Sequence, residues 1–280
     1  SFLVIEIEEI LGVFVHAPSN IRHRFNMMQS CRWYLECTPI RKSMVEVPNL
    51  GDWEMIVFDV DGTLLDREGF HDELVSLARR VDSDVMPVSL ASGRTLPNVT
   101  PILQAIGTSG FIVAENGGMV WDSAEGHEIR SLSDGSRAKE AAEWLATKID
   151  GLDPSGIESN RWRETEWCLK ETDSFETMKS LIADSEWSDL EVVSTGFAVH
   201  IANPGLNKSL GLSIAMQQRG IDPKRVIACG DAPNDIPMFD LVGFSVAVSD
   251  LYPEVVSSAD AVTDEKGKSG SIELLKALLG

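Results

Sequence analysis

The chain has 280 residues, with 44 Asp and Glu against 24 Lys and Arg and a formal net charge of −20 at pH 7, and this length suits one large domain or two smaller ones. Such an acidic surface repels polyanions, so we expect neither nucleic acid nor an anionic membrane as a partner. Four unevenly spaced cysteines do not predict a disulfide framework, and no stretch approaches the roughly 20 apolar residues of a membrane span, so we expect a soluble cytoplasmic protein.

Residues 1–43 differ in composition from the rest of the chain. They hold five Lys and Arg and four Asp and Glu, so residues 44–280 carry 19 basic against 40 acidic residues, a net charge of −21. We treat residues 1–43 as an N-terminal appendage of unknown role. Met44 lies just before the first predicted strand. The segment is therefore either an over-extended reading frame whose true start is Met44, or a real extension or interface helix.

The acidity of residues 44–280 predicts a halophilic protein. Carboxylates repel one another across the folded state, and molar salt screens this repulsion over distances beyond about 3 Å. We therefore expect both the melting temperature and the activity to rise from low to molar KCl. A thermal-denaturation series in KCl checks this, and a melting temperature that falls steadily with salt would remove the halophilic interpretation.

The first strong element is the stretch from Met55 to Asp66, which reads MIVFDVDGTLLD. Four large apolar residues followed by two carboxylates predict a buried parallel strand whose C-terminal end places Asp59 and Asp61 in a loop. Open α/β sheets bind ligands at that end of their strands. Gly62 allows a tight turn in which backbone N–H groups can approach an anion. The arrangement suits phosphoryl transfer.

Helical and strand patterns then alternate along the chain. We expect a helix from Asp72 to Val81, a strand from Val85 to Leu90 that ends in Ser92-Gly93-Arg94, a helix from Leu96 to Ile106, and a strand from Phe111 to Ala114 followed by Glu115-Asn116-Gly117-Gly118. Strand, helix and strand in alternation predict a doubly wound parallel sheet, and therefore an α/β fold.

The sequence pattern changes over residues 122–202, where helical segments are mixed with strands of alternating polarity. We expect helices at 136–149 and 174–184, and half-exposed strands at 161–170 and 190–201. This pattern predicts a small α+β insert with an antiparallel sheet. Arg161 and Arg163 are two residues apart in an alternating stretch, so they are expected to share one strand face. That face either meets a substrate carboxylate or is solvated.

The parallel sheet resumes at residue 203. We expect a helix from Lys208 to Arg219, a strand from Arg225 to Cys229 followed by Gly230-Asp231-Ala232-Pro233-Asn234-Asp235, short strands at 244–248 and 261–263, and a closing helix from Ser271 to Leu279. Each strand end again places polar residues at the edge where ligands bind.

Four of these motifs resemble, in order and separation, those of the haloacid dehalogenase (HAD) superfamily of phosphatases. They are Asp59-Val60-Asp61-Gly62-Thr63, Ser92-Gly93-Arg94, Lys208, and Gly230 to Asp235. The resemblance covers residues 54–280 and is nearest to the archaeal-type phosphoglycolate phosphatase and Cof-like sugar-phosphatase branch. It implies a HAD-like, Rossmann-like core at 44–121 and 203–280, with a small α+β cap at 122–202 between the second and third motifs.

The resemblance also implies catalytic and metal-binding roles. Asp59 would be the nucleophile that forms an aspartyl-phosphate, and Asp61 would be the general acid and then the general base. Mg²⁺ would be held by Asp59, Asp231 and the backbone carbonyl of Asp61, with Asp235 in its outer shell or positioning the lysine of the third motif.

The remaining motif residues are expected to contact the phosphate or substrate. Ser92 and the N–H of Gly93 would hold phosphate oxygens, and Lys208 would bring a positive charge to the phosphate and to the nucleophile. Arg94 is either a substrate contact or part of a structural salt bridge. Further substrate or phosphate contacts are expected from Asn234, Asn116 and Arg163.

Together these features predict a magnesium-dependent phosphatase that acts on a small phosphorylated metabolite, with 2-phosphoglycolate, cleaved to glycolate and phosphate, as the first candidate. A sugar-phosphate phosphatase similar to sucrose phosphatase and a phosphomutase similar to phosphomannomutase are the enzymatic alternatives. A non-catalytic phosphate-binding protein is a third. Release of free phosphate separates a phosphatase from a mutase, which must exclude water from its intermediate. The sequence indicates no oligomeric state.

Overall fold

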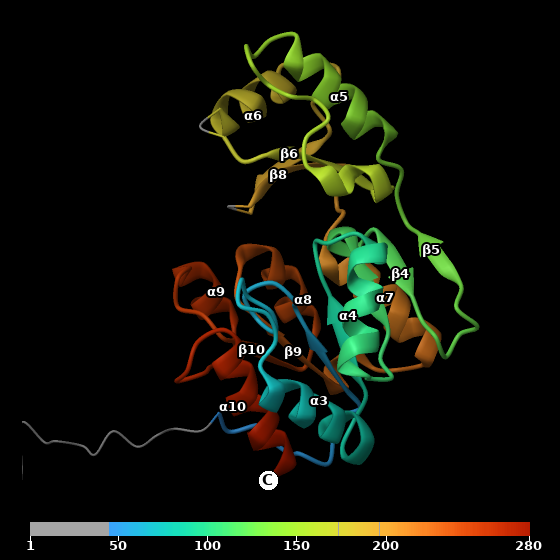
Figure 1. Ribbon diagram of the computed structural model, residues 1–280, viewed down its shortest axis with the longest axis vertical. Coiled ribbons are helices and arrows are strands. Elements are labelled where there is room, and N and C mark those ends of the chain that lie inside the picture. Colours follow the sequence, from blue (N-terminus) through green and yellow to red (C-terminus); the bar gives the residue numbers. More distant parts are fainter. Residues whose placement is uncertain (1–44, 173, 196) are drawn as a thin grey trace, which may run out of the picture. The chain divides into compact units, whose positions relative to one another are not determined.

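The computed structural model in Figure 1 describes residues 45–172, 174–195 and 197–280. The predicted appendage, residues 1–43, and the proposed start at Met44 lie outside the described residues. The described chain forms two separate sheets, one of eight strands and one of three.

The larger sheet is mostly parallel and has the first predicted strand near its centre. Its order is β11-β10-β9-β1-β2-β3-β4-β5. Its strands are β1 (Met55–Phe58), β2 (Val88–Ala91), β3 (Ile112–Ala114), β4 (Met119–Trp121), β5 (Ile129–Ser131), β9 (Val226–Gly230), β10 (Phe244–Ala247) and β11 (Ala261–Val262). All pairs from β11 to β3 are parallel, whereas β4 and β5 pair antiparallel at one edge. This confirms the predicted α/β class.

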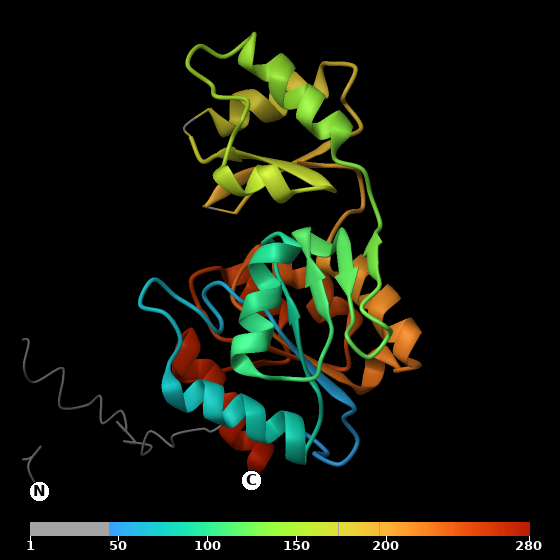
Figure 2. The same cartoon turned by 45° about the vertical axis from the view of Figure 1, so that its right-hand side comes forward.

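Helices cover both faces of this sheet (Figures 1 and 2). They are α3 (Asp72–Asp84), α4 (Leu96–Ile106), α7 (Lys208–Arg219), α8 (Ile236–Leu241), α9 (Pro253–Ser258) and α10 (Lys268–Leu279). Ile56 and Phe58 of β1 belong to the hydrophobic cluster that includes α3, α4 and α10, while Met55 and Val57 belong to the cluster that includes α7, α8 and α9. Because successive strand residues point to opposite faces, burial on both sides explains the unbroken apolar run of β1.

None of the helices in the described part of the chain is long and apolar enough to cross a membrane. The cytoplasmic location expected from the sequence stays a prediction.

The larger sheet extends further along the chain than predicted. β5 lies beyond residue 121, the predicted end of the first core segment, yet it pairs with β4 through Trp121 and Ile129. All three residues of β5 are exposed, so the strand carries no alternating apolar signal. The boundary at residue 121 is therefore too early, and the cap that we propose begins after Ser131.

The smaller sheet is antiparallel, with the order β6-β8-β7. It consists of β6 (Glu166–Lys170), β7 (Glu191–Ser194) and β8 (Ala198–Ala202), with helices α5 (Ser136–Ala146) and α6 (Phe175–Ala183). Leu169, Val199 and Ile201 pack with both helices in one hydrophobic cluster. The alternate residues Cys168 and His200 are directly paired across β6 and β8, so they point to the opposite face. We call this sheet and its two helices the cap.

The strand expected at residues 161–170 is only half present. A 3₁₀ helix, η2, occupies Glu158–Trp162, and β6 begins only at Glu166. The side chain of Asn160 donates to the carbonyls of Ser155 and Cys168 and accepts from the Cys168 N–H, which stabilises this turn. Arg161 therefore lies in a helical turn, and the prediction that it shares a strand face with Arg163 is wrong.

Candidate active site

Asp59 and Lys208 form a buried ion pair at the C-terminal edge of the larger sheet. Asp59 directly follows β1, and its Oδ1 accepts a hydrogen bond from Lys208 Nζ at 2.5 Å. The same Nζ donates to Asp235 Oδ1 at 2.6 Å. Burial alone would lower the pKa of Lys208, but Asp235 and Asp59 raise the pKa above its ordinary value. The lysine is therefore charged, between the predicted nucleophile and a second carboxylate.

Lys208 is held in place by the start of α7. The side chain of Asn207, the N-cap residue, accepts from the backbone N–H groups of Ser209 and Leu210, which satisfies the free donors of the first turn. Lys208 is the first residue of the helix and its side chain is fully buried. The helix start thus fixes where the ammonium group enters the site.

Three carboxylates come together in this site. One oxygen from each of Asp59, Asp231 and Asp235 lies within 4.8 Å of the others. Burial, with Asp235 nearby, raises the pKa of Asp231 to about 6. Burial also raises the pKa of Asp59 well above its ordinary value; Lys208 opposes this effect, while Asp235 and Asp231 add to it. A divalent cation would relieve this repulsion, so these hard oxygen donors fit Mg²⁺.

Asp235 differs from the other two because both its oxygens are engaged by the protein. Oδ1 accepts from Lys208, and Oδ2 accepts from the backbone N–H groups of Asp231 and Ala232. Asp231 Oδ1 accepts from the hydroxyl of Thr63. The geometry therefore suits Asp59 and Asp231 as ligands and Asp235 as a positioning group, the second of the two roles expected for it.

Gly62 makes room for Asp231. It has a φ of +83°, and a Cβ built there would lie 2.3 Å from Asp231 Oδ2. A side chain at this position would therefore collide with the carboxylate, in a backbone conformation that L-residues rarely adopt. The glycine of the first motif is needed for the loop after β1 to approach the acidic cluster.

The side chain of Asp61 lies outside the acidic cluster and pairs with Arg94. Arg94 Nε donates to Asp61 Oδ2 at 2.7 Å, and Nη2 donates to Oδ1 at 2.6 Å. Both side chains are partly exposed. The structure therefore shows the salt-bridge alternative for Arg94. The Asp61 carboxylate is not one of the three that come together in the acidic cluster, so this side chain is not placed for direct metal binding.

Ser92, Gly93 and Asn116 lie together beside the nucleophile's strand. Ser92 is buried, and its Oγ accepts from the N–H of Arg94. The backbone N–H of Asn116 donates to the Ser92 carbonyl, and a Cβ on Gly93 would lie 3.1 Å from Asn116 Oδ1. Asn116 has a φ of +50° in the 3₁₀ turn η1 (Glu115–Gly117), and its Oδ1 accepts from Asn234 Nδ2 at 3.2 Å. The second and fourth motifs thus meet through Asn116.

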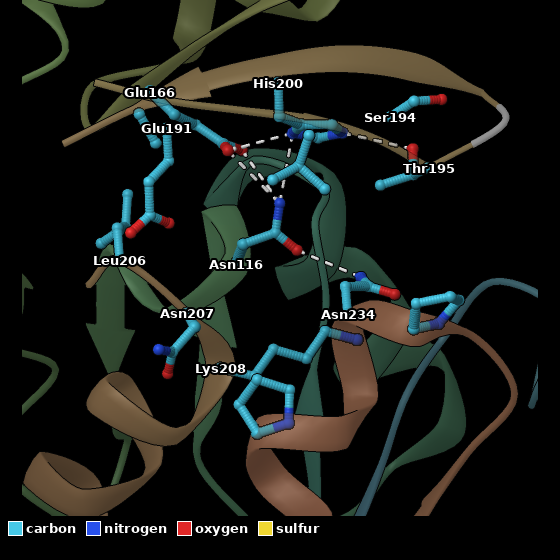
Figure 3. Close-up of a pocket in the computed structure, with 14 residues that line it drawn as sticks. Asn116, Glu166, Glu191, Ser194, Thr195, His200, Leu206, Asn207, Lys208 and Asn234 are labelled. Carbon is cyan, nitrogen blue, oxygen red and sulfur yellow. Dashed lines mark hydrogen bonds and ion pairs between the residues drawn. The ribbon is translucent and has the colours of Figure 1, made fainter. Parts of the chain in front are cut away.

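A cavity of about 270 Å³ opens onto these residues (Figure 3). The core contributes Asn116, Lys208 and Asn234 to its lining, and the cap contributes residues that the sequence analysis did not single out: Glu166, Glu191, Val193, Thr195 and His200. Residues 166–170 alternate between the two faces of β6, and this signal would have placed Glu166 on the face opposite the packed one. The alternation within β6 does not reveal, however, that β6 pairs with β8 and so brings Glu166 close to His200.

Arg161 and Arg163 do not reach this cavity. The Arg163 side chain is buried, and its Nη1 contacts Glu166 Oε1 and donates to the Gly93 carbonyl at 3.1 Å. Arg161 is exposed and pairs with Glu158. The structure therefore does not bring either arginine to the position expected for a substrate carboxylate.

Known proteins are similar to this chain in sequence and in fold. The haloacid dehalogenase-like hydrolase family matches residues 56–149 and 165–275. The phosphoglycolate phosphatase of Methanothermobacter thermautotrophicus is 32% identical over 227 residues, covering 80% of this chain and 98% of the relative. The crystal structure of Thermoplasma acidophilum 0175 has a TM-score of 0.72 at 21% identity, covering 81% and 98%. A sugar phosphatase of HAD subclass IIB has a TM-score of 0.64 at 17% identity, with the same coverage. The chain belongs to the haloacid dehalogenase-like hydrolase family.

Proposed function

We propose that the chain is a magnesium-dependent phosphatase that hydrolyses a small phosphorylated metabolite, with 2-phosphoglycolate as the first candidate. The observation that carries the proposal is the position of Lys208 Nζ, 2.5 Å from Asp59 Oδ1 and beside the acidic cluster. A phosphate ester resists attack by an anion, so a site must supply a nucleophile, positive charge and donors together. All of these parts meet at one edge of the sheet.

The chain's own residues divide the reaction into two displacements. Asp59 attacks phosphorus and forms an aspartyl-phosphate while the bond to the leaving oxygen breaks. Asp61, once released from Arg94 and protonated, gives its proton to that oxygen and then takes one from the water that attacks the aspartyl-phosphate. Lys208 offsets the negative charge of the nucleophile and phosphate, and Ser92 and the Gly93 N–H bind phosphate oxygens. Mg²⁺ held by Asp59 and Asp231 supplies further charge neutralisation when bound.

The cavity favours a small leaving group. A volume of about 270 Å³ lies just below the usual range for ligand sites, about 300–1,000 Å³. The relative named phosphoglycolate phosphatase matches nearly its whole length to this chain, which supports a two-carbon acid. Among the described residues that line the cavity, Lys208 is the only Lys or Arg. His200 is then the remaining basic side chain that could face a substrate carboxylate.

A sugar or polyol phosphate is the second candidate, supported by the polarity of the cavity. Glu191, Thr195 and Asn207 line it together with Asn116 and Glu166. Carboxylates, amides and hydroxyls accept and donate hydrogen bonds to sugar hydroxyls, whereas the two glutamates repel a substrate carboxylate. The structural likeness to a sugar phosphatase fits this alternative.

Release of inorganic phosphate from a panel of small phosphoesters tests the proposal. We expect turnover that requires Mg²⁺, is lost in EDTA, and is highest with 2-phosphoglycolate. A preference for hexose or polyol phosphates would support the second candidate and leave the phosphatase mechanism intact. Transfer of phosphate between positions of one sugar without its release would indicate a mutase. The absence of turnover on every ester would contradict the proposal.

Mg²⁺ should stabilise the protein more at pH 7.5 than at pH 5. The pKa of Asp231 is about 6 in the folded state and about 3.9 in an unfolded chain. Because the folded pKa is the higher of the two, protonated Asp231 stabilises the folded state. This contribution to the free energy of unfolding is fully present below about pH 4 and is lost as the pH rises through 6. Without metal the loss amounts to about 3 kcal/mol. Mg²⁺ binds the charged form and compensates that loss.

Melting temperatures measured with EDTA and with Mg²⁺ at the two pH values check this prediction. Asp231→Asn is the control, because an amide does not titrate and is a poor ligand. We expect the variant to show a smaller pH-dependent loss and little response to Mg²⁺. Equal stabilisation of the wild-type protein at both pH values would contradict the assignment of Asp231 as a ligand.

Arg163→Ala should destabilise the protein without changing its substrate preference. The Arg163 side chain is 2% exposed and its partner Glu166 is 1% exposed, and removing one member of a buried pair costs about 3–5 kcal/mol. Arg161→Ala is the matched control, because both Arg161 and its partner Glu158 are largely exposed and such pairs contribute little.

Thermal denaturation, together with kcat/KM for two substrates, distinguishes a structural role of Arg163 from the substrate contact expected from the sequence. We expect 2-phosphoglycolate and p-nitrophenyl phosphate, which has no carboxylate, to lose activity by the same factor in Arg163→Ala. An unchanged melting temperature with a loss confined to 2-phosphoglycolate would restore the substrate-contact role expected from the sequence.

A further inference from the structure

The inner face of the cap sheet carries a second group of metal-binding side chains, separate from the acidic cluster. Glu166 and Cys168 are two residues apart on β6, and His200 on β8 is directly opposite Cys168. All three are buried, and one ligand atom from each lies within 4.8 Å of the others. Two neighbouring strands, which are rigid elements, thus hold a thiol, an imidazole and a carboxylate together.

The contacts of His200 Nδ1 make incompatible demands on its proton. Glu166 Oε2, at 3.0 Å, requires Nδ1 to donate, whereas Asn116 Nδ2, at 3.2 Å, requires it to accept. The orientation of the Asn116 amide is fixed because its Oδ1 accepts from Asn234 (Figure 3). If Nδ1 carries a proton, two donors, Nδ1 and Asn116 Nδ2, face each other. If Nδ1 carries none, two acceptors, Nδ1 and Glu166 Oε2, face each other.

A cation among these atoms removes the conflict. His200 Nδ1, Glu166 Oε2 and Cys168 Sγ would all present lone pairs to it, and the Asn116 amide would still donate to Glu166, whose oxygens lie 3.3 and 3.4 Å away. Arg163 contacts the other oxygen, Oε1, so it orients the carboxylate without occupying Oε2. Such outer contacts are usual around protein-bound metals.

The spacing of the three groups matches a tetrahedral site. Cys168 Sγ lies 3.2 Å from His200 Nδ1, His200 Nδ1 lies 3.0 Å from Glu166 Oε2, and one ligand atom from each of the three residues lies within 4.8 Å of the others. Sulfur at about 2.3 Å and nitrogen or oxygen at about 2.0–2.1 Å from a tetrahedral ion are separated from one another by about 3.3–3.6 Å. Small movements of the side chains would bring all three into that range.

The donor set selects the class of metal. A thiolate and an imidazole favour borderline-soft ions such as Zn²⁺ over Mg²⁺, which prefers oxygen ligands and octahedral geometry. Glu166 and His200 line the 270 Å³ cavity, so a fourth coordination position would face the cavity and could take water. We propose that Glu166, Cys168 and His200 form a binding site for Zn²⁺ or a similar divalent ion in the cap, distinct from the acidic cluster around Asp59.

Titration of the full chain with Co²⁺, followed by its thiolate charge-transfer absorption and by competition with Zn²⁺, tests this site directly. Cys31 and Cys37, which lie outside the described residues, are first replaced by Ser so that they cannot contribute a thiolate. In that background we expect a thiolate band that saturates at one Co²⁺ per chain and is displaced by Zn²⁺, whereas Co²⁺ bound at the acidic cluster should give no such band. The readout does not depend on substrate or turnover.

Single substitutions then locate the ion. Cys168→Ser should remove the thiolate band, and His200→Gln should weaken binding more than about 10-fold, since even outer-shell changes at metal sites cost 10- to 100-fold. Cys229→Ser, which removes the other described cysteine, and Asp231→Asn should keep the band. Circular dichroism verifies that each variant is folded.

Three results would overturn the proposal. They are the absence of a thiolate band in the Cys31/Cys37 background, a band that survives Cys168→Ser, and a band lost in Asp231→Asn but kept in His200→Gln. The last would place the ion at the acidic cluster.

Discussion

Asp59→Asn should abolish phosphatase activity while leaving the protein folded. The amide is neither a nucleophile nor a good ligand for magnesium, so both the covalent step and metal binding are lost. The substitution also removes a carboxylate whose pKa is raised by burial and by Asp235 and Asp231, so the fold should tolerate it. Phosphate release from 2-phosphoglycolate and from p-nitrophenyl phosphate, with circular dichroism of the same samples, checks this.

Two further variants serve as a control for the Asp-to-Asn change and as a test of proton transfer. Asp240→Asn makes the same change at an exposed position of α8 and should retain wild-type activity. Asp61→Asn should lose roughly 10²-fold or more, because it removes proton transfer; the exposed pair with Arg94 that it also removes contributes little to stability. This variant should still show stabilisation by Mg²⁺. Wild-type rates in both Asp59→Asn and Asp61→Asn would show that the assigned mechanism is wrong.

The parts of the fold that the sequence predicted well are those determined by local pattern. The helices at Leu96–Ile106 and Lys208–Arg219 have the predicted bounds, because each has an amphipathic face and a left-handed glycine at its C-terminal end. β1 was predicted from a continuous apolar run, which burial on both faces of a parallel sheet requires. The order of the motifs along the strand ends then follows from the alternation of strands and helices.

What the sequence did not predict depends on contacts between distant residues. β5 is exposed and is a strand only because it pairs with β4. The turn before β6 depends on Asn160, whose side chain bonds to the backbone of Cys168. Arg163 was expected on a strand face that meets either a substrate carboxylate or solvent, but this turn directs it to Glu166 and to a carbonyl 70 residues away. No periodicity within the cap contains that information.

In the site, too, the local motifs were predictable from the sequence, whereas the contacts between distant residues were not. The motifs identified Asp59, Lys208 and Asp231, whereas the conformation that points Asn116 at Asn234 is not visible in the sequence. Glu115 and Asn116 both have positive φ, of 52° and 50°, which non-glycine residues adopt rarely and mostly where surrounding structure imposes it. In this turn, the Glu115 carboxylate accepts hydrogen bonds from the N–H and hydroxyl of Thr165, just before β6, and these contacts help to hold the unusual backbone conformation.

Lys208→Met should abolish activity and destabilise the protein at the same time. The Lys208 ammonium joins Asp59 and Asp235, which lie 149 and 27 residues away in the chain, so its removal leaves two buried carboxylates without their cation. Breaking a buried pair in this way costs about 3–5 kcal/mol. Loss of a charge aimed at the reacting phosphate costs a further factor of about 10² to 10³ in kcat. Chemical denaturation and phosphate release measure the two effects separately.

A second substitution separates charge burial from catalysis. Lys208→Met combined with Asp235→Asn removes one of the two uncompensated carboxylates, so the double variant should regain part of the lost stability. Its activity should stay at the level of Lys208→Met, because the positive charge beside Asp59 is still missing. Stability should also recover at lower pH in the single variant, since Asp59 can then take up a proton, whereas activity should not. Recovery of activity in the double variant would show that Lys208 serves only to compensate Asp235, and that the positive charge needed at the phosphate comes from elsewhere in the site.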